Sequence, residues 1–428
     1  MEKRKEKQGG KIMIKIESLK KEKGITLVAL AITIIIIIIL ATVTINMAFG
    51  DNGLIKQAQL AKEMTANSVK TEQENMNSLM QEYANVMAED SELKNKYDIF
   101  VFLYDDGTLT FGRQNEPIEG KTVVKEYGNI KGQEYSSWID EDSNRKCSTP
   151  WFNEASSITK ISIVEEIVPT SMASWFDSCV NLTELESIEK IDTSKVESMN
   201  WMFDGCRSLT SLNLSSFDTS NVIDMTAMFA HCPSLTSLNL SSFNTSNVIA
   251  MNDMFAYCTS LTTLDLRNFG TSSAVYIEGM FNGCSNLNEI LGIEKIDTIN
   301  VKNMSFMFCN CNSLTNLNLS NFNTSNVENM NRMFDGCTNL SEILGIENFD
   351  TINVKGMTLM FRNCKSLTIL DLSSFNTSKV ESMREMFVGC TNLTTIYVGN
   401  NWNLSNVDSS GMFTGCGTST TTPKGSNL

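Results

Sequence analysis

Histidine is almost missing from this sequence, whose 428 residues include only His231. That residue stands where equivalent points of the chain have Gly, Asn, Tyr or Ser, so we interpret it as an exposed variant and not as a general base. The sequence also lacks a Cys-x-x-Cys pair and a G-x-x-x-x-G-K-[ST] phosphate loop. From these absences we expect no enzymatic activity, no catalytic residue, no metal site and no cofactor.

Basic charge is scarce beyond residue 50. Residues 1–50 hold nine Lys/Arg and four Asp/Glu, so residues 51–428 hold 25 Lys/Arg against 45 Asp/Glu, a net charge of −20. Binding to a phosphate backbone needs clustered Lys and Arg that release counterions. We therefore exclude nucleic acid as a partner.

A long uncharged segment occurs once, from Ile25 to Phe49. Its 25 residues are enough, at about 1.5 Å per residue, to cross a hydrocarbon core of about 30 Å. Because residues 1–24 are basic, the positive-inside rule predicts a cytoplasmic leader, a single transmembrane helix over 25–49 and an extracellular remainder at the cell surface. A cleaved secretory signal peptide is the alternative, although this run exceeds the usual ~7–15 apolar residues.

The head of this segment reads KGITLVAL and resembles the processing site of type IV pilin-like precursors. The resemblance is confined to residues ~23–50 and implies that a prepilin-type peptidase cleaves between Gly24 and Ile25. The chain departs from that family at Ile25, where Phe is usual, and at Ala29, where Glu is usual. Since that glutamate matters for subunit registry in pili, membrane anchoring stays expected and assembly into a filament is put in doubt.

Residues 50–97 form a polar connector. A Gly-Asp-Asn-Gly turn opens it, and the stretch from Leu54 to Glu89 is rich in Lys, Glu, Gln, Ala and Met, with apolar residues at helical spacing from Met76 to Met87. We predict a solvated stalk helix that holds the rest of the chain away from the membrane. A partner-binding coiled coil is the alternative, which so short an apolar stripe does not favour.

Residues 98–168 predict a β cap. The stretch DIFVFLYDDGTLTFG places β-branched and aromatic residues around an Asp-Asp-Gly turn, as in a hairpin. The stretch ITKISIVEEIV alternates apolar and polar residues, as a strand does. Because a solenoid needs its first coil covered, we expect this region to close the stack, with Trp151 and Trp175 at its end.

The rest of the chain, over residues 169–417, is repetitive. Met-Phe-x-x-Cys motifs, two of which read MFDGC, recur with cysteines 26 or 27 residues apart in ten units. A fixed period of this length is typical of a solenoid, whose units bury their apolar faces only against one another. The repeated cysteines are Cys179, Cys206, Cys232, Cys258, Cys284, Cys311, Cys337, Cys364, Cys390 and Cys416.

Each unit carries a strand pattern followed by a helical one. Leu235, Leu238 and Leu240 follow the L-x-x-L-x-L pattern of a leucine-rich repeat, which predicts a short strand with its polar residues facing outward. The apolar residues from Val248 to Phe255 then fall on one helical face, and the Asn-Thr-Ser stretch at 244–246 offers an N-cap. The predicted fold class is therefore an α/β solenoid, a leucine-rich-repeat-like stack of ten strand-plus-helix units. Three units have one extra residue between the last two core positions of the strand.

The recurring Met, Phe and Cys are interpreted as stacked interior side chains. An extracellular chain with 12 cysteines invites disulfides, but Cβ atoms stacked about 4.8 Å apart lie outside the usual ~3.5–4.5 Å of a disulfide, so we favour buried free thiols.

Cys309 breaks the register and forms a Cys-x-Cys with Cys311, where a metal site is the lesser alternative. The Asp and Asn of the FDTSNV turns lack the dense carboxylates of calcium sites, and turn capping explains them.

Units such as MFDGCRSLTSLNLSSFDTSNVIDM, preceded by LYDDGTLTFG and PTSMASWFDSC, resemble the BspA-family leucine-rich repeat surface proteins of bacteria over residues ~98–417. The resemblance implies a cell-surface protein, since members of that family are described as adhesins that bind host matrix proteins or neighbouring bacteria. The chain departs from the family in its pilin-like N-terminal segment, which replaces a lipoprotein anchor or a wall-sorting signal. We expect the tail at 418–428 to be disordered.

We predict a membrane-anchored bacterial surface protein that binds a protein or glycan ligand outside the cell through its strand face. That face is poor in the Trp, Tyr and Arg that usually anchor interfaces, and its Ser, Thr and Asn also suit plain strand solubility. The alternative is a structural role, as a pilin-like minor subunit or a passive surface layer. The candidate ligand-binding residues are Ser211, Asn213, Ser237, Asn239, Thr263, Asp265, Arg267, Asn318 and Asp371.

Overall fold

The computed structural model describes residues 97–139 and 145–424. Contacts between residues divide the chain into two compact units, Met1–Val86 and Met87–Leu428. The described residues all belong to the second unit, which therefore carries every structural feature given below.

Several sequence predictions fall on the first 96 residues. The leader, the transmembrane helix and almost all of the stalk helix lie outside the described residues, as does the cleavage site at Gly24 and Ile25. Within 97–139 and 145–424, no helix is long and apolar enough to cross a membrane. The membrane span and its processing thus stay predictions.

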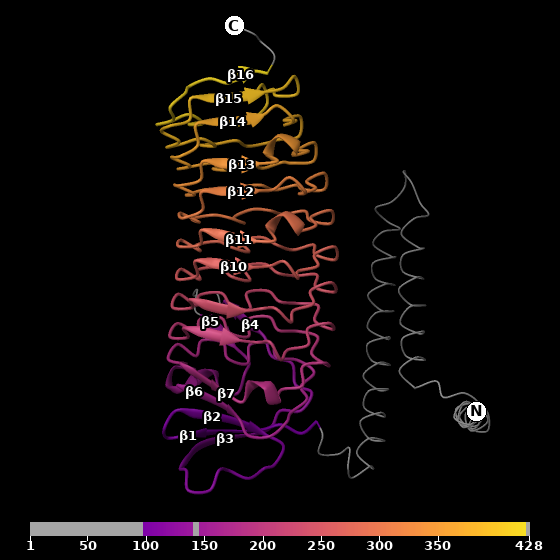
Figure 1. Ribbon diagram of the computed structural model, residues 1–428, viewed down its shortest axis with the longest axis vertical. Coiled ribbons are helices and arrows are strands. Elements are labelled where there is room, and N and C mark those ends of the chain that lie inside the picture. Colours follow the sequence, from indigo (N-terminus) through magenta and orange to yellow (C-terminus); the bar gives the residue numbers. More distant parts are fainter. Residues whose placement is uncertain (1–96, 140–144, 425–428) are drawn as a thin grey trace, which may run out of the picture. The chain divides into compact units, whose positions relative to one another are not determined.

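A five-stranded sheet begins the described unit and runs in the order β3-β1-β2-β6-β7 (Figure 1). Its bounds are β1 Phe100–Tyr104, β2 Thr108–Gly112, β3 Val123–Asn129, β6 Lys160–Ile163 and β7 Glu184–Glu186. β1 and β2 form the predicted hairpin, whose turn contains Gly107 at φ +80°, a left-handed conformation that glycine adopts without strain. β2 pairs in parallel with β6, and β6 with β7, so the hairpin and the first repeat share one sheet and leave no open edge between them.

Aromatic side chains fill the junction between the hairpin and the repeats. The ring of Phe111 stacks on Trp175 at 5.0 Å and meets Trp151 edge-on at 5.5 Å. Both tryptophans are buried, and Trp151 Nε1 donates to the carbonyl oxygen of Trp175 at 2.6 Å. These contacts tie the sheet to the first coil through packing as well as through strand pairing.

Stacked coils continue from this sheet to β16, each with one short strand in a common column (Figure 1). Like residues pair in register, for example Ser211 with Ser237 and Leu212 with Leu238, and the middle residue of most strands points inward. The predicted repeat solenoid is confirmed. Its strands are β8 Ser211–Asn213, β9 Ser237–Asn239, β10 Thr263–Asp265, β11 Glu289–Leu291, β12 Asn316–Asn318, β13 Glu342–Leu344, β14 Ile369–Leu372, β15 Thr395–Val398 and β16 Thr422–Pro423.

The remaining short elements of the described residues are a strand pair and four 3-10 helices. β4 Ser137–Ile139 and β5 Arg145–Cys147 form an antiparallel pair, and η1 is a 3-10 helix over Phe152–Ser157. The extra residue of each 27-residue unit is taken up in one 3-10 turn after the strand, namely η2 Ile188–Lys190, η3 Ile293–Lys295 and η4 Ile346–Asn348. Gly292 and Gly345, which precede η3 and η4, have φ of +85° and +88°, so the extra residue is absorbed by a left-handed turn.

A second row of strand-like contacts follows the stack on another side. Its members form a chain of parallel bridges between consecutive coils, and they are Ser198, Asp224, Ala250, Tyr276, Asn303, Asn329, Gly356, Ser382 and Asp408. We call the surface made by these residues and by the residue directly before each of them the ladder face. The backbone N–H of Ile249, for instance, donates to the Ile223 carbonyl at 2.8 Å, so one coil is tied to the next whatever the side chain.

The predicted helix of each unit is wrong, since the described residues contain no α-helix. In the unit of Val248 to Cys258, Asp253 and Tyr257 have φ of +54° and +59°, and a left-handed residue at both points ends any right-handed helix. The segment is instead a run of tight turns. Its alternate N–H groups donate to the next coil, as Met251 does to Tyr276 at 2.8 Å and Phe255 does to Met280 at 3.0 Å.

The expected N-cap at 244–246 is consequently wrong as well. The threonine at this repeat position instead bonds to the next coil, as Thr219 shows. Thr219 is buried, and its Oγ1 both donates to the Asn244 carbonyl at 3.0 Å and accepts from the Asn244 N–H at 2.8 Å. Most units repeat this arrangement, with hydroxyl-to-carbonyl distances of 2.7–3.0 Å from Thr193 to Thr377. A buried hydroxyl with both its donor and its acceptor satisfied fastens each coil to the next.

Phenylalanine and cysteine ladders run through the interior, as the repeat motif predicts. Consecutive rings such as Phe281, Phe308 and Phe334 stack with centroids 5.5–5.8 Å apart. All twelve cysteines are free, and ten of them are buried. The thiol of Cys258 donates to the Phe229 carbonyl at 3.0 Å, and burial raises its pKa well above the ordinary value, which keeps the donor proton on sulfur.

Residues 418–424 of the C-terminal tail depart from the expected disorder, and residues 425–428 lie outside the described residues. β16, which lies in this tail, pairs in parallel with β15. Lys424 Nζ contacts Asp371 Oδ2 at 2.5 Å. The last full coil would otherwise present an open strand edge, and the tail supplies a short partner for it.

Candidate functional site

The predicted strand-face residues share one surface of the column. Eight of the nine are exposed and Asp371 is half-buried, because polar and apolar side chains alternate along strands such as β8 and β10. Arg267 lies two residues beyond Asp265, at the end of β10. The structure therefore brings the predicted residues onto a common face, spread over several coils.

Five of these nine residues use an oxygen to close the turn after the strand. Oδ1 of each accepts the backbone N–H two residues further on, at 3.0–3.2 Å, and the five are Asn213, Asn239, Asp265, Asn318 and Asp371. Such bonds are typical of Asn and Asp in turns. Much of the polarity at this position is therefore structural, which the strand pattern alone did not reveal.

Charged residues on the strand face also pair within it. Arg267 Nε and Nη2 donate to the two Asp265 carboxylate oxygens at 2.9 and 2.5 Å. The hydrogen bond from Arg267 lowers the pKa of Asp265 to about 2, so this carboxylate stays ionised at any pH of interest. An incoming ligand must compete with that pair or bind both members of it.

A hollow on the strand face lies at its first coils. It has a volume of about 410 Å³ and is lined by residues of β7, β8 and the turns beside them, including Glu184, Glu189, Ser211 and Asn213. Only two of the nine predicted residues border it. The others lie on the open surface of later strands.

The ladder face changes character along the stack. After the exposed Glu197 of its first coil, the next three coils expose apolar residues: the side chains of Ile223, Ile249 and Tyr276 are 44%, 40% and 53% exposed. In the four coils after these the residue before each bridge is charged, in the order Lys302, Glu328, Lys355 and Glu381, and the last coil has Val407. This charged row was missed from the sequence, although its alternation at intervals of 26 or 27 residues in VKNM, VENM, VKGM and VESM is visible there.

Two adjoining hollows open beside the charged row, and both are lined by Glu328 and Lys355. One has a volume of about 360 Å³ and is also lined by Lys302, Asn326, Asn353 and Lys379. The other, of about 370 Å³, is also lined by Asn329, Asn331, Gly356, Thr358, Glu381 and Ser382. Lys355 Nζ lies 2.6 Å from Glu328 Oε2, so one ion pair borders both hollows.

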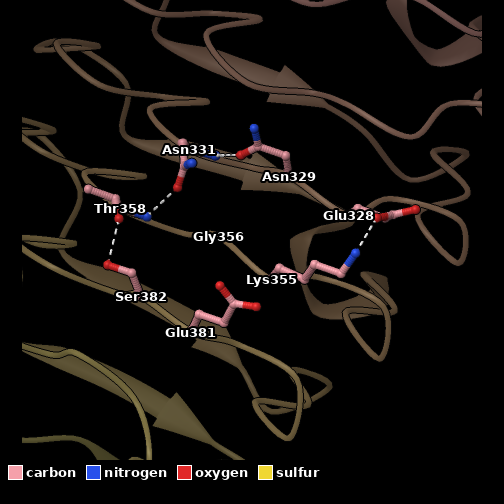
Figure 2. Close-up of a pocket in the computed structure, with 8 residues that line it drawn as sticks. All are labelled: Glu328, Asn329, Asn331, Lys355, Gly356, Thr358, Glu381 and Ser382. Carbon is pink, nitrogen blue, oxygen red and sulfur yellow. Dashed lines mark hydrogen bonds and ion pairs between the residues drawn. The ribbon is translucent and has the colours of Figure 1, made fainter.

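Figure 2 shows the second hollow, with polar side chains arranged around Gly356. A short chain of hydrogen bonds fixes its wall. Asn331 Oδ1 accepts the Thr358 N–H at 2.7 Å, and the Thr358 and Ser382 hydroxyls lie 2.8 Å apart. A Cβ atom at Gly356 would come within 2.8 Å of the Asn331 side chain, so glycine leaves room for that amide.

The two MFDGC motifs each bury an aspartate against a basic residue of the next coil. Asp335 accepts from Arg362 Nε and Nη2 at 2.7 and 2.6 Å. Asp204 lies 2.8 Å from Nδ1 of His231, whose side chain is 49% exposed, as predicted, and whose ring stacks on Tyr257 at 5.0 Å. A buried charge is costly without a partner, so both pairs hold coils together.

In the described part of the chain, no three His, Cys, Asp or Glu side chains lie close enough together to hold a metal ion. Cys309, the residue of the Cys-x-Cys pair, is buried. Its sulfur lies 3.4 Å from Asn310 Nδ2, and burial raises the pKa of its thiol to about 11. A protonated thiol is a poor metal ligand.

Comparison with known proteins gives a family and several distant structures. The model of the family described as "Mycoplasma protein of unknown function, DUF285" matches residues 170–292, 261–345, 280–397 and 315–424. These stretches together span more than half of the chain. No curated protein matches it.

Solved structures similar to the chain include three bacterial repeat proteins. A leucine-rich cell surface protein from Faecalibacterium prausnitzii A2-165 is 15% identical, with a TM-score of 0.34 over 76% of this chain and 93% of the other. A leucine-rich repeat protein from Bacteroides ovatus is 18% identical, with a TM-score of 0.29 over 74% and 91%. One from Eubacterium ventriosum is 14% identical, with a TM-score of 0.22 over 76% and 95%.

Proposed function

This chain belongs to the DUF285 family, and we propose that it is a non-enzymatic binding module at a bacterial cell surface. Its N-terminal segment anchors it in the membrane, and its strand face takes a protein or glycan ligand. The ligand is bound by repeated polar contacts, with no chemical step and no cofactor.

The observation that carries this proposal is a column of exposed, uncommitted hydroxyl groups. The side chains of Ser211, Ser237 and Thr263 occupy the first position of β8, β9 and β10 and are exposed. Their hydroxyls form no hydrogen bond with any residue of the described ranges. Groups that repeat at the spacing of successive coils suit an extended ligand laid along the stack.

Rigidity of the scaffold supports the same proposal. The strand column is held by backbone pairing, the threonine ladder and the stacked interior rings. A surface that is already ordered loses little conformational entropy when it binds. Weak individual contacts can then add to a useful affinity over several coils.

Binding of the full chain to arrays of matrix proteins, glycans and whole bacterial cells tests the proposal. The informative variant is Asp265→Lys, which reverses a charge on the strand face. Asp297→Lys is its matched control, because Oδ1 of Asp297 also accepts an N–H two residues on, from Ile299 at 3.0 Å, but Asp297 lies outside the strands.

We expect saturable binding that Asp265→Lys weakens at least tenfold, about 1.4 kcal/mol, and that Asp297→Lys leaves unchanged. Binding that neither variant weakens would show that the ligand binds outside the strand face. An absence of binding to every array would instead favour the structural role, as a pilin-like minor subunit or a passive surface layer.

A further inference from the structure

We propose that the ladder-face hollow bounded by Lys302, Lys355 and Lys379 binds the anionic group of an acidic sugar. This site lies on a different face from the strand column. It goes beyond the proposed function, because it adds a second surface and a class of ligand.

Positive charge is concentrated here in a chain that is otherwise acidic. Three lysines and one glutamate, Glu328, line the hollow, whereas residues 51–428 carry a net charge of −20. The hydrogen bond from Lys355 and the nearby charges of Lys302 and Lys379 lower the pKa of Glu328. The surplus of lysine makes the hollow a place where an anion lowers the electrostatic energy.

Two of the three ammonium groups are held in place and one is open. Lys355 Nζ lies 2.6 Å from Glu328 Oε2, and Lys379 Nζ donates to Asn353 Oδ1 at 2.7 Å. The Lys302 ammonium makes no hydrogen bond or ion pair within the described ranges. A single carboxylate or sulfate can therefore pair with the Lys302 ammonium and accept hydrogen bonds from the remaining N–H groups of Lys355 and Lys379.

The walls of the hollow are fixed by bonds to the preceding coil. Asn326 Nδ2 donates to the Ile299 carbonyl at 2.7 Å, and Asn353 Nδ2 donates to the Ser325 carbonyl at 2.8 Å. These amides stand at equivalent points of neighbouring coils and cannot rotate without losing those bonds. The site is thus ordered before any ligand arrives, which reduces the entropy lost on binding.

The chemistry of the lining favours a sugar over an acidic peptide. Every side chain around the hollow is an amide, a carboxylate or an ammonium group, whereas protein partners are usually anchored by buried aromatic residues and arginine. The adjoining hollow adds the Thr358 and Ser382 hydroxyls and the amides of Asn329 and Asn331. An acidic sugar in the first hollow would place the hydroxyl groups of its neighbour against these donors and acceptors.

The test measures binding of the full chain to a carboxylated oligosaccharide, oligogalacturonate, and to a sulfated one, a heparin fragment, with dextran as the neutral probe. The variants are Lys302→Ala and Lys379→Ala. Lys195→Ala is the matched control, because Lys195 in DTSKV occupies the repeat position of Lys379 in NTSKV and is equally exposed. All three remove one surface charge, so equal melting temperatures show that the fold is kept.

We expect one or both acidic probes to bind and dextran not to bind. Each hollow variant should weaken binding about fivefold, as for a partly exposed charge contact, and added salt should weaken it further. Lys195→Ala should leave this binding unchanged. Equal weakening by Lys195→Ala would reveal unspecific attraction of polyanions and would overturn the proposal, as would failure of both acidic probes to bind.

Discussion

Two neighbouring regions of the ladder face share one backbone arrangement and differ in chemistry, one apolar from Ile223 to Tyr276 and one charged from Lys302 to Glu381. At Ile223 and Ile249 the exposed side chain before the bridge is aliphatic, and at Lys302 and Lys355 it is cationic. The bridges are nevertheless continuous through both regions. At Tyr276 an exposed aromatic ring marks the change from one region to the other.

This difference teaches that the fold is determined by the interior and the turns. Each rung is held by main-chain bonds, by a buried threonine and by a stacked phenylalanine, none of which involves the outward side chain. The outer positions are therefore free to differ in chemistry without a change of scaffold. Function in such a solenoid is to be sought where outward residues depart from the repeat.

The largest expected effect comes from the part that the two regions have in common. Phe229 and Phe334 are fully buried, and each stacks on a ring in both neighbouring coils at 5.4–5.9 Å. Replacing either with Ala should lower the free energy of unfolding by about 3–5 kcal/mol, through lost burial and the cavity left behind. Urea unfolding of the full chain, followed by circular dichroism, measures both losses.

Similar losses at the two positions would support a uniform interior beneath a varied surface. Tyr276→Ala is the exposed control and should change stability by no more than about 0.5 kcal/mol. A loss at one position that is more than twice the loss at the other would show that the two regions differ inside as well as outside.

The next effect concerns Asp253, a partly buried acid whose equivalent in the later unit that ends at Cys390 is Glu385. Burial, followed by the charge of Glu278, raises the pKa of Asp253 to about 6, whereas the equivalent residue of a later unit is Arg332. Because the folded-state pKa lies above the unfolded one, the folded chain binds the proton more tightly. Its contribution to stability is full below about pH 4 and is lost as the pH rises through about 6.

Asp253→Asn should therefore raise stability at pH 7 by roughly 1–2 kcal/mol, after allowance for partial solvent screening. It should also flatten the dependence of stability on pH between about 4 and 6. Asparagine tolerates the left-handed backbone at this position. Melting temperatures across this pH range compare the variant with Asp297→Asn, and equal slopes for the variant and the unchanged chain would contradict the prediction.

Sequence patterns predicted the coil and its core but not the form of its second half. The spacing of Val248, Met251 and Met254 fits one face of a helix, yet consecutive turns with inward-facing residues produce the same spacing. The backbone angle φ distinguishes the run of turns from a helix, because it is positive at Asp253 and Tyr257. Gly205, Gly336 and Gly389 at the equivalent place of other units were a usable signal, because glycine disfavours a helix interior.

The candidate sites too were predictable only in part from the sequence. Alternation along L-x-x-L-x-L placed Ser211 and Asn239 on an exposed face correctly. It could not show that the Asn239 oxygen closes its own turn, since that depends on the local backbone. The grouping of Lys302, Lys355 and Lys379 required knowing that successive coils stack in register, which brings residues 24 to 77 positions apart around one hollow.

The smallest expected effect is an exchange of outward side chains between the two regions. Ile249→Lys and Lys355→Ile should each change the free energy of unfolding by no more than about 0.5 kcal/mol. The reason is that the N–H of Ile249 bonds to the Ile223 carbonyl and that of Lys355 to the Glu328 carbonyl, both at 2.8 Å. Binding should respond unequally to the exchange, because Lys355→Ile removes one of three converging charges whereas Ile249→Lys places a single charge among Ile223 and Val275. A gain of acidic-sugar binding by Ile249→Lys, measured against oligogalacturonate, would mean that one lysine on this scaffold suffices and that the three-lysine hollow has no special role.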